Sequence, residues 1–231
     1  MEERKNIKEL DLRNLNLEGD LDLAGFPSHL KVYLAGNPHL GKIKNKTHWT
    51  KLIYQNPQEF LDYLSYNKNQ LEKIDLEGLD FDKSSKFELI LDNYPQLKEI
   101  DGNFIDSSII KITISNCSQL EEVCVGYSKS LKTLNLNNLP NLKKLDCREN
   151  NLTILDLTNF TNLERLECFN NRLTEIKLPK GEKLEYLHLG RNNFNHDLSF
   201  LKDLVNLKEL YLFGNKFTGS LKPLKDLNKL E

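Results

Sequence analysis

The chain has 231 residues, of which 39% are hydrophobic and 29% are charged, so it is long enough to bury a continuous core. Basic and acidic residues nearly balance, and the net charge of −2 provides no general attraction to nucleic acid or to an anionic membrane. The opening segment MEERKNIKEL lacks the apolar core of a signal peptide, and no apolar run approaches the ~18 residues of a membrane-spanning helix. We therefore expect a folded cytoplasmic protein that binds neither nucleic acid nor membrane.

Short motifs of alternating apolar residues begin near the N-terminus. In each motif an apolar residue stands three positions after the first residue, and in all but one a second stands five positions after it. A period of two predicts short β-strands that point their apolar side chains inward. The motifs start at Ile7, His29, Leu71, Leu97 and Leu120, and the exception is Gly102 in the fourth.

Residues 45–68 interrupt these motifs and predict a short helical insert of two helices. Thr47 would cap the first helix, and Leu52 and Ile53 would face the core. One interpretation is that the insert covers the core on the convex side. The other is that it forms a docking surface, because it contains Trp49, the one tryptophan of the chain.

The second helix of the insert has the stronger signal. Asn56 is a good N-cap, Pro57 suits the first helical position, and Glu59 follows in the first turn. Two further short helical stretches are predicted over residues 84–94 and 198–205.

A stricter motif then repeats four times in the pattern L-x-x-L-x-(L/C)-x-x-N. The copies begin at Leu142, Leu163, Leu184 and Leu207, which are 21, 21 and 23 residues apart. A second series of strand motifs lies about 11 residues out of phase with the first. It starts at Ile109, Leu131, Leu152 and Leu173.

The strict motif resembles the signature of the leucine-rich-repeat family. The resemblance implies an α/β solenoid, a right-handed superhelix rich in strands, with repeats of 21–23 residues, often two strands per turn, and a short helical insert. We expect residues 1–231 to form one such domain and its C-terminal end to be truncated. Nine main strands at ~4.8 Å spacing would form a ladder of roughly 40 Å.

The asparagine that closes each strict motif recurs at one phase. If these amides are buried, they must hydrogen-bond to backbone groups of neighbouring turns. The asparagines at this phase are Asn37, Asn150, Asn171, Asn192 and Asn215.

The four cysteines show no metal-binding or disulfide spacing. Cys147 and Cys168 stand at inward leucine positions and are interpreted as core residues. Cys124 falls at an outward position and could be an exposed thiol. We expect no metal and no cofactor.

Two sets of residues point outward from the predicted concave face of the main sheet. A cluster of aromatic rings near the C-terminus is the first candidate protein-binding site. Its alternative is cover by a further C-terminal segment of the chain. This ring cluster consists of Phe169, Tyr186, His188, Tyr211 and Phe213.

The second set is an acidic patch in the N-terminal half, which would favour a basic partner. The alternative is that these carboxylates only keep the sheet soluble. The acidic patch consists of Asp75, Glu77, Glu99, Asp101 and Glu122.

The sequence contains no motif of a metal-dependent hydrolase, of a serine hydrolase or of a phosphate-binding loop. We therefore expect that the protein is not an enzyme. The resemblance implies a non-catalytic module that binds a protein through the concave face, as a monomer. The alternative is the recognition arm of a larger protein, of kinase, ubiquitin ligase or immune/effector type, whose remaining domain lies beyond residue 231.

Overall fold

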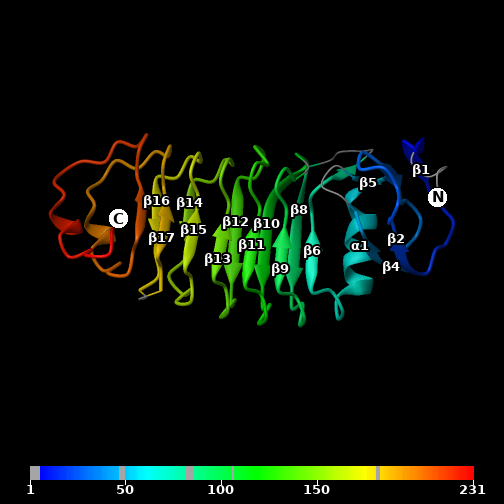
Figure 1. The fold of residues 1–231 in the computed structure, drawn as a ribbon, viewed down its shortest axis with the longest axis horizontal. Coiled ribbons are helices and arrows are strands. Elements are labelled where there is room, and N and C mark those ends of the chain that lie inside the picture. Colours follow the sequence, from blue (N-terminus) through cyan, green and yellow to red (C-terminus); the bar gives the residue numbers. More distant parts are fainter. Residues whose placement is uncertain (1–5, 47–49, 82–85, 106, 181–182) are drawn as a thin grey trace.

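The computed structural model describes residues 6–46, 50–81, 86–105, 107–180 and 183–231. They form an elongated stack of short strands that runs from the N-terminus to the C-terminus (Figure 1). All strand pairs in the described residues are parallel. The predicted strand-rich solenoid is therefore confirmed.

The main sheet has seven strands in the order β18-β17-β15-β13-β11-β9-β6. Equivalent residues of successive turns lie opposite one another, so that Leu145 pairs with Leu166 and Leu166 with Leu187. These three side chains are at most 1% exposed. The strands are β6 (Lys73–Asp75), β9 (Glu99–Asp101), β11 (Glu122–Cys124), β13 (Lys144–Asp146), β15 (Arg165–Glu167), β17 (Tyr186–His188) and β18 (Glu209–Tyr211).

A second series of strands lies between the main ones in sequence, as its phase predicted. Three of them form the sheet β12-β10-β8, and two more pair as β14-β16. Many turns therefore carry two strands, which close the leucine core between them. These strands are β8 (Phe87–Asp92), β10 (Ile109–Ser115), β12 (Thr133–Asn137), β14 (Ile154–Asp156) and β16 (Glu175–Lys177).

Strands form at all nine expected main positions, but those of the N-terminal turns do not continue the main sheet, so the nine strands do not make one continuous ladder. The N-terminal strands form the separate sheets β1-β3-β5-β7 and β2-β4. The insert places β5 beside β3, and the two strands pair in parallel. The strands are β1 (Glu9–Asp11), β2 (Gly19–Asp22), β3 (Lys31–Tyr33), β4 (Leu40–Lys44), β5 (Lys51–Tyr54) and β7 (Leu79–Phe81).

The insert contains one of the two expected helices in the described residues. α1 (Pro57–Asn67) begins as predicted, because the Asn56 side chain accepts hydrogen bonds from the backbone N–H groups of Gln58 and Glu59. The other expected helix is wrong where it is described. Residues of β5 pair with β3 on one side and β7 on the other, and this pairing overrides local helix signals. Thr47 and Trp49 lie outside the described residues.

The helix expected over 84–94 is also wrong, because Phe87–Asp92 is the strand β8. Its buried Leu89 and Leu91 alternate with exposed Glu88 and Ile90, which is the period of a strand. Residue 84 lies outside the described residues. The stretch 198–205 is helical over a single 3-10 turn, η2 (Ser199–Leu201), and a similar turn, η3 (Lys222–Leu224), follows β18.

The recurring asparagines form the predicted amide ladder. Asn171 donates from Nδ2 to the carbonyls of Cys147 and Cys168, and its Oδ1 accepts the N–H of Leu152. Asn192 repeats this arrangement one turn later with Cys168, Leu189 and Leu173. The residue before each asparagine has a left-handed backbone, as at Glu149, Asn170 and Arg191. Each amide therefore joins two successive turns where the chain leaves the main sheet.

Replacing one ladder amide should destabilise the protein markedly. Asn192→Ala leaves the buried N–H of Leu173 without its partner and removes one of the two donors to each of the Cys168 and Leu189 carbonyls, which keep Asn171 and Asn215. We expect the free energy of unfolding to fall by about 3 kcal/mol. Urea denaturation followed by circular dichroism measures the loss. The matched control is Asn141→Ala, because Asn141 is exposed and makes a single bond to the Ser118 carbonyl. Equal stability of the two variants would contradict a structural role for the ladder.

Candidate functional site

The outward side chains of the last turns of the main sheet bring the predicted ring cluster together. His188 lies at the centre, 4.5 Å from Phe169, 4.9 Å from Tyr211 and 5.4 Å from Phe213 between ring centroids. Tyr186 lies 5.6 Å from Tyr211. Tyr211 is 39% and Phe213 54% exposed, whereas the other three rings of the cluster are half-buried. All five predicted residues therefore lie on one continuous surface.

Arginine side chains extend this surface by packing on the rings. The guanidinium of Arg165 lies 3.5 Å from the centroid of Tyr186, and that of Arg191 lies 6.0 Å from Phe213. Arg148 lies between two rings, 5.4 Å from Tyr127 and 5.8 Å from Phe169. Such contacts are favourable because the cation faces the negative surface of the ring.

The surface also includes residues that sequence analysis missed. Tyr127 stacks on Phe104 at 4.8 Å, which continues the rings across earlier turns to the end of β9. Both residues have a left-handed backbone, with φ of 57° and 59°, in the turn position that Glu149 and Asn170 occupy later. Phe104 and Tyr127 stand three residues after the ends of β9 and β11. The strand pattern therefore placed them in loops and not on the outward face of the sheet. We call Phe104, Tyr127, Arg148, Phe169, Tyr186, His188, Tyr211 and Phe213 the ring row.

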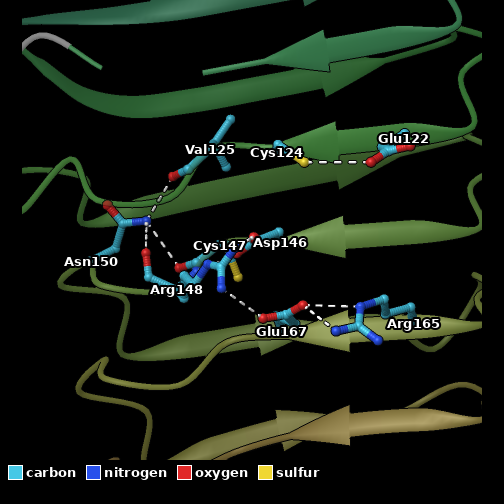
Figure 2. Close-up of polar contacts among 9 residues, drawn as sticks. All are labelled: Glu122, Cys124, Val125, Asp146, Cys147, Arg148, Asn150, Arg165 and Glu167. Carbon is cyan, nitrogen blue, oxygen red and sulfur yellow. Dashed lines mark hydrogen bonds and ion pairs between the residues drawn. The ribbon is translucent and has the colours of Figure 1, made fainter. Parts of the chain in front are cut away.

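Buried carboxylates hold Arg148 and Arg165 in place, and Figure 2 shows Glu167 between the two arginines. Arg148 contacts Asp146 at 2.7 Å and Glu167 at 3.1 Å, and Arg165 contacts Glu167 at 2.6 Å. Asp146 and Glu167 are only 9% and 8% exposed. Burial raises the pKa of Asp146, although the nearby Arg148 opposes this shift. The charges of the two arginines are thus largely matched within the sheet.

Two further features keep the centre of the ring row compact and neutral. Burial lowers the pKa of His188, and its Nδ1 accepts the backbone N–H of Gly190, an interaction that only the unprotonated nitrogen can make. Gly190 is also required for space. A Cβ there would stand 2.8 Å from the His188 ring and 3.1 Å from the Phe213 ring.

The cysteines lie where the strand phase placed them. Cys147 and Cys168 are fully buried in the core, as predicted. Cys124 faces outward but is half-buried beside Glu122 (Figure 2). Burial, and then the charges of Asp146 and Glu122, raise its pKa to about 12. The thiol therefore stays protonated at neutral pH and is a poor nucleophile.

The predicted acidic patch lies along the first turns of the main sheet, but lysines neutralise most of it. Lys73 bridges Glu99 at 2.6 Å and Asp101 at 3.0 Å. Lys46 pairs with Asp75 at 2.7 Å, and Lys144 lies 3.4 Å from Glu122. Glu77 lies in the turn after β6, where its N–H donates to Asp75. This pairing favours the interpretation that these carboxylates keep the sheet soluble.

The described residues hold no group of three or more histidine, cysteine or acidic side chains placed to bind a metal ion. No helix in this part of the chain combines the length and the apolar character that a membrane crossing requires.

The parallel strands, leucine core and asparagine ladder define a solenoid repeat protein. Residues 140–180 and 161–203 match the family model described as Leucine Rich repeats (2 copies), and residues 206–227 match the Leucine Rich Repeat model. The chain is therefore a leucine-rich-repeat protein, which confirms the resemblance.

Two solved structures of the same repeat class are similar to this chain. A leucine-rich-repeat protein of Leptospira interrogans is 19% identical with a TM-score of 0.46, over 99% of this chain and 66% of its own. This chain thus spans just under two thirds of that protein. An internalin from Listeria monocytogenes is 16% identical with a TM-score of 0.37, over 100% of this chain and 87% of its own. No curated protein matches the sequence.

The raised thiol pKa gives a direct chemical prediction. A pKa of about 12 leaves roughly one Cys124 in ten thousand as thiolate at pH 8. In urea the thiol recovers its ordinary pKa, and the thiolate fraction at pH 8 rises about 2000-fold. The more basic native thiolate is more than about tenfold more nucleophilic, so we expect iodoacetamide to alkylate Cys124 about 100-fold more slowly in the native protein than in urea. Mass spectrometry of timed digests measures both rates. Rapid native alkylation would show that Cys124 is the exposed thiol that its outward phase allows.

Proposed function

We propose that this protein is a non-catalytic module that binds a protein partner through the ring row. The observation that supports this most is the continuity of the row, in which each aromatic or arginine side chain contacts the next across successive turns. Aromatic and arginine side chains dominate the binding energy of protein interfaces. A sheet of seven strands at ~4.8 Å spacing is about 29 Å wide, which suits an interface of ordinary size.

The chemistry of the face favours binding over catalysis. Asp146 and Glu167 are held by arginines, and the Cys124 thiol has a raised pKa. None of these groups is poised as a base or nucleophile at neutral pH. We propose a protein partner rather than a nucleic acid, because the charges of Arg148 and Arg165 are matched by Asp146 and Glu167 and leave little of the excess positive charge that phosphates require.

Removing two exposed rings at the C-terminal end of the ring row should weaken capture without unfolding the protein. We expect Tyr211→Ala/Phe213→Ala to recover a specific partner at least about tenfold less efficiently from a lysate, since both rings project from the sheet. Quantitative mass spectrometry of the captured proteins measures the difference. The melting temperature should change little, because neither side chain is in the core.

Two variants make this test specific. Ile90→Ala/Ile154→Ala removes two side chains, each 58% exposed, from the second series of strands and should leave capture unchanged. Gly190→Ala keeps every ring but forces His188 and Phe213 to move, and should weaken capture. If wild-type protein and the double ring variant recover the same proteins equally, or if neither recovers any, the ring row is not the binding site.

A further inference from the structure

The main sheet ends at β6, beside a cavity of about 300 Å³. The cavity lies between β4 and β6, and α1 and β5 form its inner walls. Figure 1 shows α1 between β4 and β6 along the stack, where a strand would continue the ladder. A helix is about 10 Å wide and the strand spacing is about 4.8 Å. A helix at this place therefore holds β4 and β6 too far apart for their edges to hydrogen-bond to each other.

The cavity lies beside the edges of the two strands rather than on their faces. Its lining includes the consecutive residues Lys42 to Lys44 of β4 and Glu72 to Asp75 around β6. Successive side chains of a strand point to opposite faces, so an uninterrupted run can line one cavity only from the edge. In the described part of the chain, β6 pairs with β9 alone and β4 with β2 alone.

The ladder register shows which backbone groups face the cavity from β6. The Glu72 carbonyl accepts the N–H of Glu99, and the Leu76 N–H donates to the carbonyl of Asp101. Residues 72, 74 and 76 therefore direct their peptide groups toward β9. Because these directions alternate along a parallel strand, the peptide groups of Lys73 and Asp75 point away from β9, toward the cavity.

The edge of β4 is partly covered. The Lys44 carbonyl accepts the N–H of Leu23, the residue after β2, so Ile43 faces the other way. Tyr63 of α1 accepts a backbone hydrogen bond from Ile43. Lys46 closes one end of the cavity, where its Nζ contacts Asp75 and the Glu77 carbonyl, both at 2.7 Å. The edge of β6 is therefore the one that offers backbone hydrogen bonds.

The side chains around the cavity are apolar on the inside and charged on the outside, where four lysines outnumber the carboxylates of Glu72 and Asp75. Leu52, Phe60 and Leu64 line its floor and are at most 4% exposed. Lys42 and Lys44 on β4, and Lys73 on β6, stand at the outer side. Lys42 makes no ion pair with another described residue. Lys44 pairs with Asp20, and Lys73 is already bridged to Glu99 and Asp101.

We propose that this cavity receives an extended peptide segment that adds a strand to the open edge of β6. Main-chain hydrogen bonds to Lys73 and Asp75 would hold the segment, as in other cases of strand addition. Its inward side chains are apolar, because they meet the floor. Its outward side chains are acidic, because they meet Lys42 of β4, which has no ion-pair partner among the described residues, and opposite charges on neighbouring strands attract. The site is separate from the ring row.

The probe for this site is an acetylated and amidated pentapeptide in which aspartate and valine alternate. Isothermal titration calorimetry should show saturable binding of one peptide per chain. Two N-methylated isomers distinguish strand addition from binding through side chains alone. One is methylated at the valine amides and the other at the aspartate amides. Alternate amides face opposite edges, so one isomer should bind about tenfold more weakly and the other nearly as well as the parent.

A pair of variants at one position tests the edge of β6. Lys73→Pro removes the N–H that faces the cavity and leaves the hydrogen bonds to β9, which proline tolerates at an open edge. Lys73→Ala removes the same charge and keeps the N–H. We expect the proline variant to bind the pentapeptide about tenfold more weakly than the alanine variant, with unchanged circular dichroism.

Several results would overturn the proposal. They are absence of peptide binding, equal binding of the two N-methylated isomers, or equal binding by Lys73→Pro and Lys73→Ala. Octanoate serves as a probe without a peptide backbone. If octanoate binds and the pentapeptide does not, the cavity is a site for small organic acids instead.

Discussion

No single turn of this chain can bury its own leucines, and every other feature of the structure depends on that constraint. Leu145, Leu166 and Leu187 reach about zero exposure only because the turns before and after each of them supply the remaining walls. The chain must also change direction after each strand without leaving buried amides unpaired. Asn171 and Asn192 satisfy this second requirement by bonding to carbonyls of two successive turns.

The same register that stacks the core aligns the outward side chains in columns. One column contains aligned positions that hold Cys124, Asp146, Glu167, His188 and Tyr211. The backbone is nearly the same at each of these positions, so the character of the face is set by side chains alone. Carboxylates in the middle turns bind arginines, and aromatic rings in the last turns pack on one another. The resulting face is neutral and largely aromatic where it is most exposed.

The helical insert changes this arrangement locally. Neighbouring strands satisfy each other's backbone N–H and C=O groups. A helix forms its backbone hydrogen bonds internally and offers none to a neighbouring strand. α1 compensates with side chains, through Tyr63 at Ile43 and through Asn67 at the Leu40 carbonyl. Both contacts reach β4, and among the described residues α1 makes no equivalent contact with the edge of β6. The solenoid therefore has an interruption with distinct chemistry at one end and a continuous face at the other.

The sequence by itself determined the parts of this protein that depend on local period and spacing. The leucines and asparagines of the strict repeats gave the register of β13 to β18, the inward place of Cys147 and Cys168, and the outward place of Tyr211 and Phe213. Asn56 and Pro57 located the start of α1. These signals are short-range, because each arises within one turn of the chain.

Tertiary structure decided what depends on contacts between turns. Lys51–Tyr54 became a strand because β3 and β7 flank it, and the main sheet ended at β6 because a helix took the next place in the ladder. Phe104 and Tyr127 joined the ring row through stacking between turns, and Lys73 neutralised carboxylates 26 and 28 residues away. Such pairings join residues far apart in sequence, and no local pattern records which distant partner a side chain or a strand edge will meet.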